Sequence, residues 1–253
     1  MTAVAPRHQP AAAPLGLDIL SEAVSYQRWM VERMAPHCGT GILELGAGIG
    51  NLSRMLPGER LVLTEPDEAL LEQLRAVAEH PPLSERSVRV AAFDPTRESG
   101  EQFDHEPLDT VVSANVLEHI HDHVGALGTL AALLDRTAVG RPKRIITLVP
   151  AHPLAYGPMD REMGHYRRYT ARHLRQVHAA AIPNAHVKVE GFNVVGLAGW
   201  FVSGRVLRRS ALEHGTVRAA ERAVPLLRWA DAVARPLLPR PVGQSLISVA
   251  RWT

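Results

Sequence analysis

The residues with the most evident chemistry surround a glycine-rich turn early in the chain. Glu44 lies near the end of an apolar run, and glycines stand at the first, third and fifth positions of residues 46–50. A second apolar run, residues 60–64, leads to another acid, Glu65, 15 residues beyond Gly50. Glycine has no Cβ, so the backbone can approach a ligand closely. A carboxylate placed like Glu65 can bind a ribose diol, so these residues indicate a nucleoside site.

The elements that would position these groups are a strand, a turn and a helix. Residues 41–45 predict a short buried strand, and residues 51–56 have helical spacing. The first N–H groups of such a helix would point into the same crevice. Asn51 stands where the dinucleotide fingerprint has its last glycine, so nothing here requires a pyrophosphate. The spacing therefore disfavours a dehydrogenase.

The run Glu-Leu-Gly-Ala-Gly-Ile-Gly, residues 44–50, resembles the first motif of class I S-adenosylmethionine (SAM)-dependent methyltransferases. The resemblance covers residues 39–191 and the final apolar strand, 245–250. It implies a Rossmann-like α/β fold with a seven-stranded, mostly parallel sheet whose last strand is antiparallel. Ligands of such sheets bind at the carboxyl ends of the strands. The alternation of helical and strand patterns along the chain agrees with this fold class.

The resemblance also implies a set of cofactor-binding residues at successive strand ends. After the third predicted strand, 88–92, an acid contacts the adenine amine in the family and its neighbour packs on the base. The fourth, 109–115, presents carbonyl groups to the α-amino group. Asp94 has a rival role as a turn or cap residue before Pro95, and Tyr26 has one in the core, where we place Trp29. The cofactor set is Tyr26, Glu44, Gly46, Ala47, Gly48, Gly50, Glu65, Pro66, Phe93, Asp94, Ser113 and Asn115.

Two further segments predict the acceptor side of the site. Asn-Val-Leu-Glu-His, residues 115–119, is similar to a motif of small-molecule methyltransferases, which implies that His119 faces the acceptor. A long loop, 151–169, follows the fifth predicted strand, and its end resembles a signature, Gly-His-Tyr-Arg-Arg-Tyr-Thr, of one bacterial subgroup. The alternative for Arg167 and Arg168 is that they form ion pairs that lock this loop. The predicted catalytic residues are His119, His165, Asp160 and Tyr169, with Tyr166 as an alternative to Tyr169 in the pocket.

A metal site is the other interpretation of the histidines after the fourth strand. His119, His121 and His123 alternate along the chain. Residues two apart do not share a helix face, so the three suit a metal only in an extended segment. Residues 122–123 instead begin the next predicted helix, 124–134. We therefore expect no metal here.

Composition restricts the class of protein. The chain has 253 residues, 46% hydrophobic and 21% charged, as in an ordinary globular protein. The net charge is only +2, and all basic residues except Lys143 and Lys188 are arginine, so we expect no nucleic-acid partner. Cys38 is the only cysteine, which rules out an internal disulfide. We find no signal-peptide core and no run of about 18 apolar residues, and expect a cytoplasmic protein without a membrane-spanning helix.

Four regions are predicted along the chain. Residues 1–38 form a start that is disordered over 1–14 and a helical cap, 39–191 the SAM-binding core, 192–243 a helical insertion and 244–253 the last strand of the core. The insertion is predicted to be a lid or packing layer. A dimer face and an interfacial membrane helix stay open as alternatives, and the protein is expected to be a monomer or a homodimer.

These observations predict an enzyme that transfers methyl from SAM to a small molecule in bacterial secondary metabolism. In-line positioning of nucleophile, methyl carbon and sulfur would supply most of the rate. His119, His165 and Asp160 are the candidate bases. One alternative is a SAM-consuming enzyme of different chemistry, such as cyclisation of SAM to azetidine-2-carboxylate with release of methylthioadenosine. The other is a SAM-binding module without catalysis.

Overall fold

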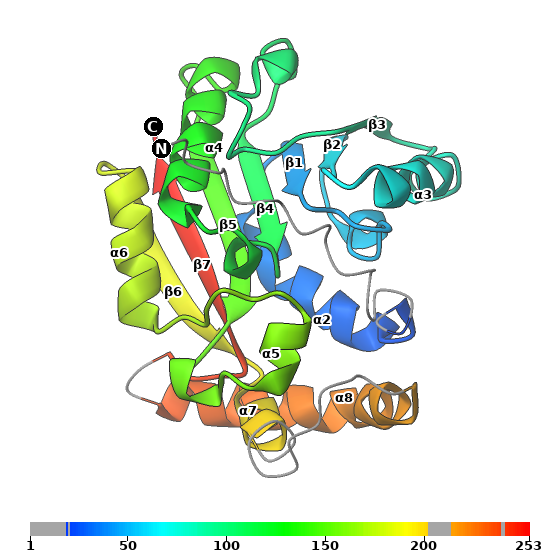
Figure 1. Cartoon of the computed structure of the whole chain (residues 1–253), viewed down its shortest axis with the longest axis vertical. Helices are drawn as coiled ribbons and strands as arrows, with labels where there is room; N and C mark the ends of the chain where they lie inside the picture. The colour runs from blue at the N-terminus through cyan, green and yellow to red at the C-terminus, as the bar shows by residue number, and fades with distance from the viewer. Residues whose placement is uncertain (1–18, 20, 202–213, 239–240) are drawn as a thin grey trace, which may run out of the picture.

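A seven-stranded sheet forms the centre of the computed structural model, which describes residues 19, 21–201, 214–238 and 241–253 (Figure 1). The strand order is β3-β2-β1-β4-β5-β7-β6. Pairing is parallel from β3 to β5, and β7 runs antiparallel to both of its neighbours. This confirms the predicted mostly parallel sheet with an antiparallel last strand. The strands are β1 Gly41–Leu45, β2 Arg60–Thr64, β3 Ser87–Ala91, β4 Thr110–Ala114, β5 Lys143–Pro150, β6 His186–Phe192 and β7 Ser245–Trp252.

The central strands are apolar because both of their faces are covered. Every residue of β1 is buried, and Leu43 aligns with Val62 of β2 on one side and Val111 of β4 on the other. Continuous apolar runs of this kind are typical of parallel strands between two helical layers. Their carboxyl ends therefore meet at one edge of the sheet, where the candidate residues follow them.

Helices cover the sheet on both faces (Figure 1). On one face, Leu130 of α4 and Leu174 of α6 belong to a single apolar core. On the other, Met34, Leu74 and Val224 come from α2, α3 and α8. The helices are α2 Val24–Met34, α3 Glu68–Ala78, α4 His123–Thr137, α5 Pro158–Glu162, α6 Ala171–Ala181, α7 Val194–Phe201 and α8 His214–Ala234.

The helix predicted at residues 51–56 is not formed. A turn and a three-residue 3₁₀ helix, η2 Ser53–Met55, stand in its place. Leu56 is extended because Pro57 follows it, which ends the helical segment. The expectation that a helix N-terminus would point into the crevice is therefore wrong, and the glycine turn must bind a ligand with its own backbone and with nearby side chains.

The insertion before the last strand packs on the helix at the start of the described chain. Glu221 of α8 accepts hydrogen bonds from the backbone N–H groups of Ser25 and Tyr26, at 2.5 and 3.2 Å. Asp231 accepts the N–H of Val194, the first residue of α7, at 2.9 Å. These contacts support a packing layer. Within the described ranges, no helix is long and apolar enough to cross a membrane. The start predicted as disordered, residues 1–14, lies outside those ranges.

Candidate functional site

The glycine turn lies directly against the segment that follows β4. Gly46, Gly48 and Gly50 all have positive φ angles, +66°, +57° and +81°, which glycine adopts without strain. A Cβ on Gly46 would come within 2.7 Å of the Val116 side chain. Ala47, between Gly46 and Gly48, donates its N–H to the carbonyl of Thr64 at 2.9 Å, so the turn is joined to the end of β2. The turn after β1, the end of β2 and the start of the post-β4 segment thus meet at one place.

Two buried acids stabilise this turn in different ways. Glu65 accepts the N–H of Gly48 at 2.9 Å and that of Asp67 at 3.1 Å, and burial raises its pKa. Glu44 accepts the hydroxyl of Ser53 at 2.5 Å, and burial raises its pKa to about 7. Glu65 therefore lies at the turn, as predicted for a ribose ligand, while Glu44 is bonded to the η2 segment beyond it. Pro66, also in the predicted set, is exposed next to Glu65.

The acid after β3 has the turn role that was weighed against a cofactor role. One oxygen of Asp94 accepts the N–H of Thr96 at 2.9 Å and its hydroxyl at 2.7 Å, and Arg97 pairs with the other at 3.3 Å. Phe93 is only 1% exposed and packs edge-on against Phe103, with 5.3 Å between ring centroids. This places Phe93 in the core. Contact of either residue with an adenine stays a prediction.

The end of β4 carries two more predicted cofactor residues. Asn115 has a left-handed backbone with φ +56°, donates its N–H to Leu148 at 2.8 Å and is exposed. Ser113 is fully buried, and its hydroxyl has no hydrogen-bond partner among the residues that the structure describes. Of the two residues, Asn115 is the better placed to contact a ligand, because Asn115 is exposed and Ser113 is buried.

Tyr26 connects α2 to the junction between β6 and the insertion. Its hydroxyl lies 3.3 Å from the Asn193 amide and 3.4 Å from that of Gln244. Its ring contacts Trp29 and Phe192 edge-on, and burial raises its pKa to about 12. Trp29 is buried, which confirms its predicted core position. The contacts of Tyr26 explain its position by packing, so its role toward a cofactor stays a prediction.

The long loop after β5 is fastened to the post-β4 segment by backbone contacts. Tyr166 donates its N–H to the carbonyl of Glu118 at 2.8 Å. Arg167 donates to the carbonyls of Ile120 and His121, at 2.6 and 3.0 Å. Figure 1 shows this loop and α5 near the end of the sheet where β4 and β5 finish. The arrangement brings residues some 46 positions apart into one site.

Asp160 organises the loop from within. Its Oδ1 lies 2.7 Å from Nε of Arg168 and 2.9 Å from Nδ1 of His165, and its Oδ2 accepts the N–H of Gly157 at 2.8 Å. Burial opposes ionisation, yet the bonds from His165 and Arg168 hold the pKa of Asp160 below its ordinary value. The predicted ion pair that locks the loop is thus present for Arg168. Because both Asp160 oxygens are engaged and buried, we assign it a positioning role rather than that of the base.

Tyr169, another predicted catalytic residue, also has a packing role. Its side chain is fully buried, and its hydroxyl donates to the carbonyl of Leu117 at 3.1 Å. Burial raises its pKa to about 12. A buried phenol in these bonds has no open path to an acceptor, so we assign Tyr169 to the core and not to the reaction.

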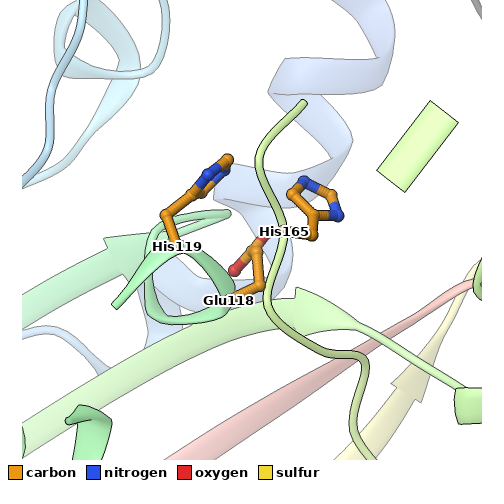
Figure 2. A group of neighbouring side chains, drawn as sticks. All are labelled: Glu118, His119 and His165. Carbon is orange, nitrogen blue, oxygen red and sulfur yellow. The ribbon is translucent and has the colours of Figure 1, made fainter. Parts of the chain in front are cut away.

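Glu118, His119 and His165 form the one group of three possible metal-binding side chains found among the described residues, with one ligand atom of each within 4.8 Å of the others (Figure 2). The first two belong to the short η4 helix, Leu117–His119, and the third follows α5. The rings of His119 and His165 are 4.7 Å apart at 84°. Glu118 is fully buried, and burial raises its pKa to about 8. Desolvation and the neighbouring His165 lower the pKa of His119.

Sequence reasoning placed His119 and His165 in the site but missed Glu118. The signal was available, because Glu118 is the one acid in the run 116–120, which is apolar apart from Glu118 and His119. From the sequence, His121 and His123 were considered as partners of His119, whereas the histidine beside it in the structure is His165. His123 instead contacts Tyr169 and His173, at ring distances of 5.7 and 5.8 Å.

Part of the chain matches a known protein family. A sequence family described as a methyltransferase domain matches residues 43–139, from β1 to the end of α4. No curated protein sequence matches the chain. The matched region contains the glycine turn, Glu65, Asp94, Asn115 and His119, but ends before the loop that carries His165.

Several solved structures are similar across most of the chain. A SAM-dependent methyltransferase from Mesorhizobium loti is 16% identical, with a TM-score of 0.54 over 89% of this chain and 98% of that one. Another from Archaeoglobus fulgidus is 13% identical, with a TM-score of 0.54 over 90% and 94%. The [4+2]-cyclase SpnF is 14% identical, with a TM-score of 0.55 over 88% and 80%. At such identities the likeness establishes the fold, which is the Rossmann-like class I methyltransferase fold.

Proposed function

We propose that this protein is a cytoplasmic enzyme that binds SAM and transfers its methyl group to a small-molecule acceptor in bacterial secondary metabolism. The observation that carries the proposal is the contact between Glu65 and Gly48. It holds an acid from the end of β2 at the glycine turn after β1, in the order and spacing of a nucleoside site. The match of residues 43–139 to a methyltransferase domain supports the same proposal.

In this proposal the cofactor lies across the carboxyl ends of β1, β2 and β4. Glu65 accepts hydrogen bonds from the ribose hydroxyls, and the positive-φ glycines let the backbone approach the ligand closely. Asn115, exposed at the end of β4, lies where the amino acid end of SAM would be bound. Asp94 reaches the adenine only if it exchanges part of its bonding to Thr96 and Arg97, since one oxygen is bonded to each.

Methyl transfer from SAM requires chiefly that the protein hold the acceptor in the correct position. The sulfonium group of SAM is already a strong electrophile, so an acceptor held in line with the methyl carbon reacts through proximity. A base is needed only for a protonated acceptor. His119 is the candidate for this role because its side chain is exposed beside His165 and its ring is neutral near pH 7, although its lowered pKa makes it a weak base. Asp160 and Arg168 would keep His165 in a fixed orientation beside it.

A different SAM chemistry is the second candidate. The fold likeness to SpnF, whose name describes a cyclase, is the observation that favours weighing it. In self-cyclisation the α-amine of SAM attacks its own γ-carbon and methylthioadenosine leaves. That route needs a bent methionine chain held by close contacts. The insertion before β7 offers material to shape a pocket for a separate acceptor, so methyl transfer remains our first choice.

The nucleoside products distinguish these candidates. Purified protein is incubated with SAM alone and with a panel of hydroxyl-, amine- and carboxyl-bearing acceptors, with boiled protein as the control. S-adenosylhomocysteine that appears together with a methylated acceptor supports methyl transfer. Methylthioadenosine formed above the control without an acceptor would establish the cyclase instead. SAM bound tightly but unchanged with every acceptor would indicate a binding module.

A further inference from the structure

We propose that Glu118, His119 and His165 bind one divalent transition-metal ion, of the Zn²⁺ or Mn²⁺ kind, on the acceptor side of the site. One ligand atom from each side chain lies within 4.8 Å of the other two (Figure 2). The ion itself is independent of the proposed function. Only its use, the binding of an acceptor oxygen next to the methyl donor, rests on that function.

The burial of the Glu118 carboxyl group favours a bound cation. Glu118 is 0% exposed, and neither of its oxygens has a hydrogen-bond partner in the described part of the chain. An ionised carboxylate in such surroundings is very costly unless a cation compensates it. The charge of Arg168 acts on Glu118, but the hydrogen bonds of its guanidinium go to Asp160 and to the Ala151 carbonyl, at 2.7 and 3.2 Å. A bound cation would satisfy Glu118 where the side chains around it do not.

The His165 ring is held in the orientation of a metal ligand. Its Nδ1 lies 2.9 Å from Oδ1 of Asp160, so Nδ1 carries the proton and Nε2 keeps a free lone pair. A carboxylate behind a metal-binding imidazole is the usual way in which proteins fix its tautomer and direction. Asp160 is itself held by Arg168 and by the N–H of Gly157. The support expected behind a metal ligand is therefore in place.

The His119 ring lies between His165 and Gly164 with one nitrogen left for a ligand. It stands nearly perpendicular to the ring of His165 and donates a hydrogen bond to the backbone carbonyl of Gly164. The ring atom nearest to Gly164 is Nδ1, 4.0 Å from where a Cβ would stand. This leaves Nε2 for a ligand. A ring nitrogen binds a metal ion through its unprotonated lone pair.

The donor set of two imidazoles and one carboxylate determines the class of ion. Imidazole and carboxylate ligands suit Zn²⁺, Mn²⁺, Fe²⁺ and Co²⁺ more than the oxygen-seeking Mg²⁺ or Ca²⁺. Metal–ligand bonds of about 2.0–2.2 Å would draw the three side chains together by roughly 1 Å. Three protein ligands leave at least one coordination position open for water or for an oxygen of the acceptor. The acceptor class indicated is thus a hydroxyl, enol or carboxylate compound.

The test is metal binding by the full chain, measured apart from activity. Protein stripped with a chelator is titrated with Zn²⁺ and Mn²⁺ by calorimetry, and Co²⁺ loading is followed by its visible absorption. We expect one ion per chain. Glu118→Gln and His165→Ala should each weaken binding at least about tenfold. His121→Ala, which removes an exposed histidine two residues from His119, should bind like the original protein.

Two results would overturn this proposal. One is an original protein that binds no metal ion, and the other is Glu118→Gln that binds as tightly as the original. Glu118→Gln removes only a charge and should keep the fold, which circular dichroism verifies. SAM affinity is measured on the same samples. Absence of metal binding with SAM binding intact would reject the metal site alone, whereas absence of SAM binding would reject the proposed function.

Discussion

The Glu65 carboxylate accepts a hydrogen bond from the backbone N–H of Gly48 at 2.9 Å. The two residues are 17 positions apart and follow adjacent parallel strands, β2 and β1. The contact places a buried acid against a turn whose glycines have left-handed backbones. It is the point at which strand order, turn conformation and side-chain chemistry combine in the proposed nucleoside site.

Loss of the Glu65 carboxylate should weaken SAM binding. A hydrogen bond to a charged group is worth about 1.5–3 kcal/mol, so Glu65→Ala should reduce affinity roughly ten- to a hundredfold. Calorimetric titration measures the change. Glu68→Ala, at the exposed start of α3, is the matched control and should leave affinity unchanged. Equal affinities for Glu65→Ala and the original protein would show that this acid does not bind the ligand.

Substitution of either clustered histidine should lower turnover more than cofactor affinity. His119 and His165, whose rings are 4.7 Å apart, belong to the proposed acceptor side of the site. We expect His119→Ala and His165→Ala to reduce kcat while the Kd for SAM changes little. His121→Ala serves as the control in both assays. If both variants keep full activity, the loop is only scaffold.

Removal of the Arg168 guanidinium should destabilise the fold strongly. Arg168 and Asp160 are both 1% exposed in their side chains and lie 2.7 Å apart. Arg168→Met leaves the buried Asp160 carboxylate without its guanidinium partner, which costs about 3–5 kcal/mol in unfolding free energy. Chemical denaturation measures this loss.

A second substitution controls for this loss. Adding Asp160→Asn to Arg168→Met should restore part of the stability, because no unpaired charge then remains. A double variant that is less stable than Arg168→Met alone would contradict the account of the ion pair.

His178 should make stability fall in mild acid. It is fully buried, its Nε2 lies 2.7 Å from the Ser248 hydroxyl, and burial, followed by the charge of His123, lowers its pKa from 6.5 to about 4. The unfolded chain then binds a proton before the folded one does. Stability is therefore complete above about pH 6.5 and is lost as pH falls toward 4, by about 3 kcal/mol in total.

The comparison variant for this effect is His178→Gln, which keeps a hydrogen-bonding side chain near Ser248. Unfolding free energies of the two proteins are measured from pH 7.5 to pH 4. Their difference should change in favour of His178→Gln as pH falls. A difference that stays constant across this range would show that His178 titrates alike in the folded and unfolded chains.

Local pattern predicted the parts of the site that follow strand ends. The central strands β1, β2, β4 and β5 were recognisable as short, largely apolar runs, and Glu65 could be placed because it directly follows one of them. The helix expected at 51–56 failed because Pro57 ends the segment after one turn. Apolar spacing alone does not measure how far a helix extends.

The acceptor side could not be derived in the same way. Glu118 and His165 meet only because the loop after β5 folds back, where Tyr166 bonds to the Glu118 carbonyl. Asp160 looked like a candidate base in sequence, but its three bonds inside the loop are tertiary contacts without a sequence signature. The residue types in this loop indicated chemistry, but only the fold distinguished the candidate His165 from Asp160, which positions it.

The most direct test of the central claim is equilibrium binding of cofactors to the unaltered protein. Calorimetric titrations with SAM, S-adenosylhomocysteine and NAD are compared under one set of conditions, and mass spectrometry identifies any ligand that co-purifies. The account predicts saturable binding of SAM or S-adenosylhomocysteine at one site per chain and none for NAD. Tight binding of NAD with no binding of either adenosyl compound would contradict it.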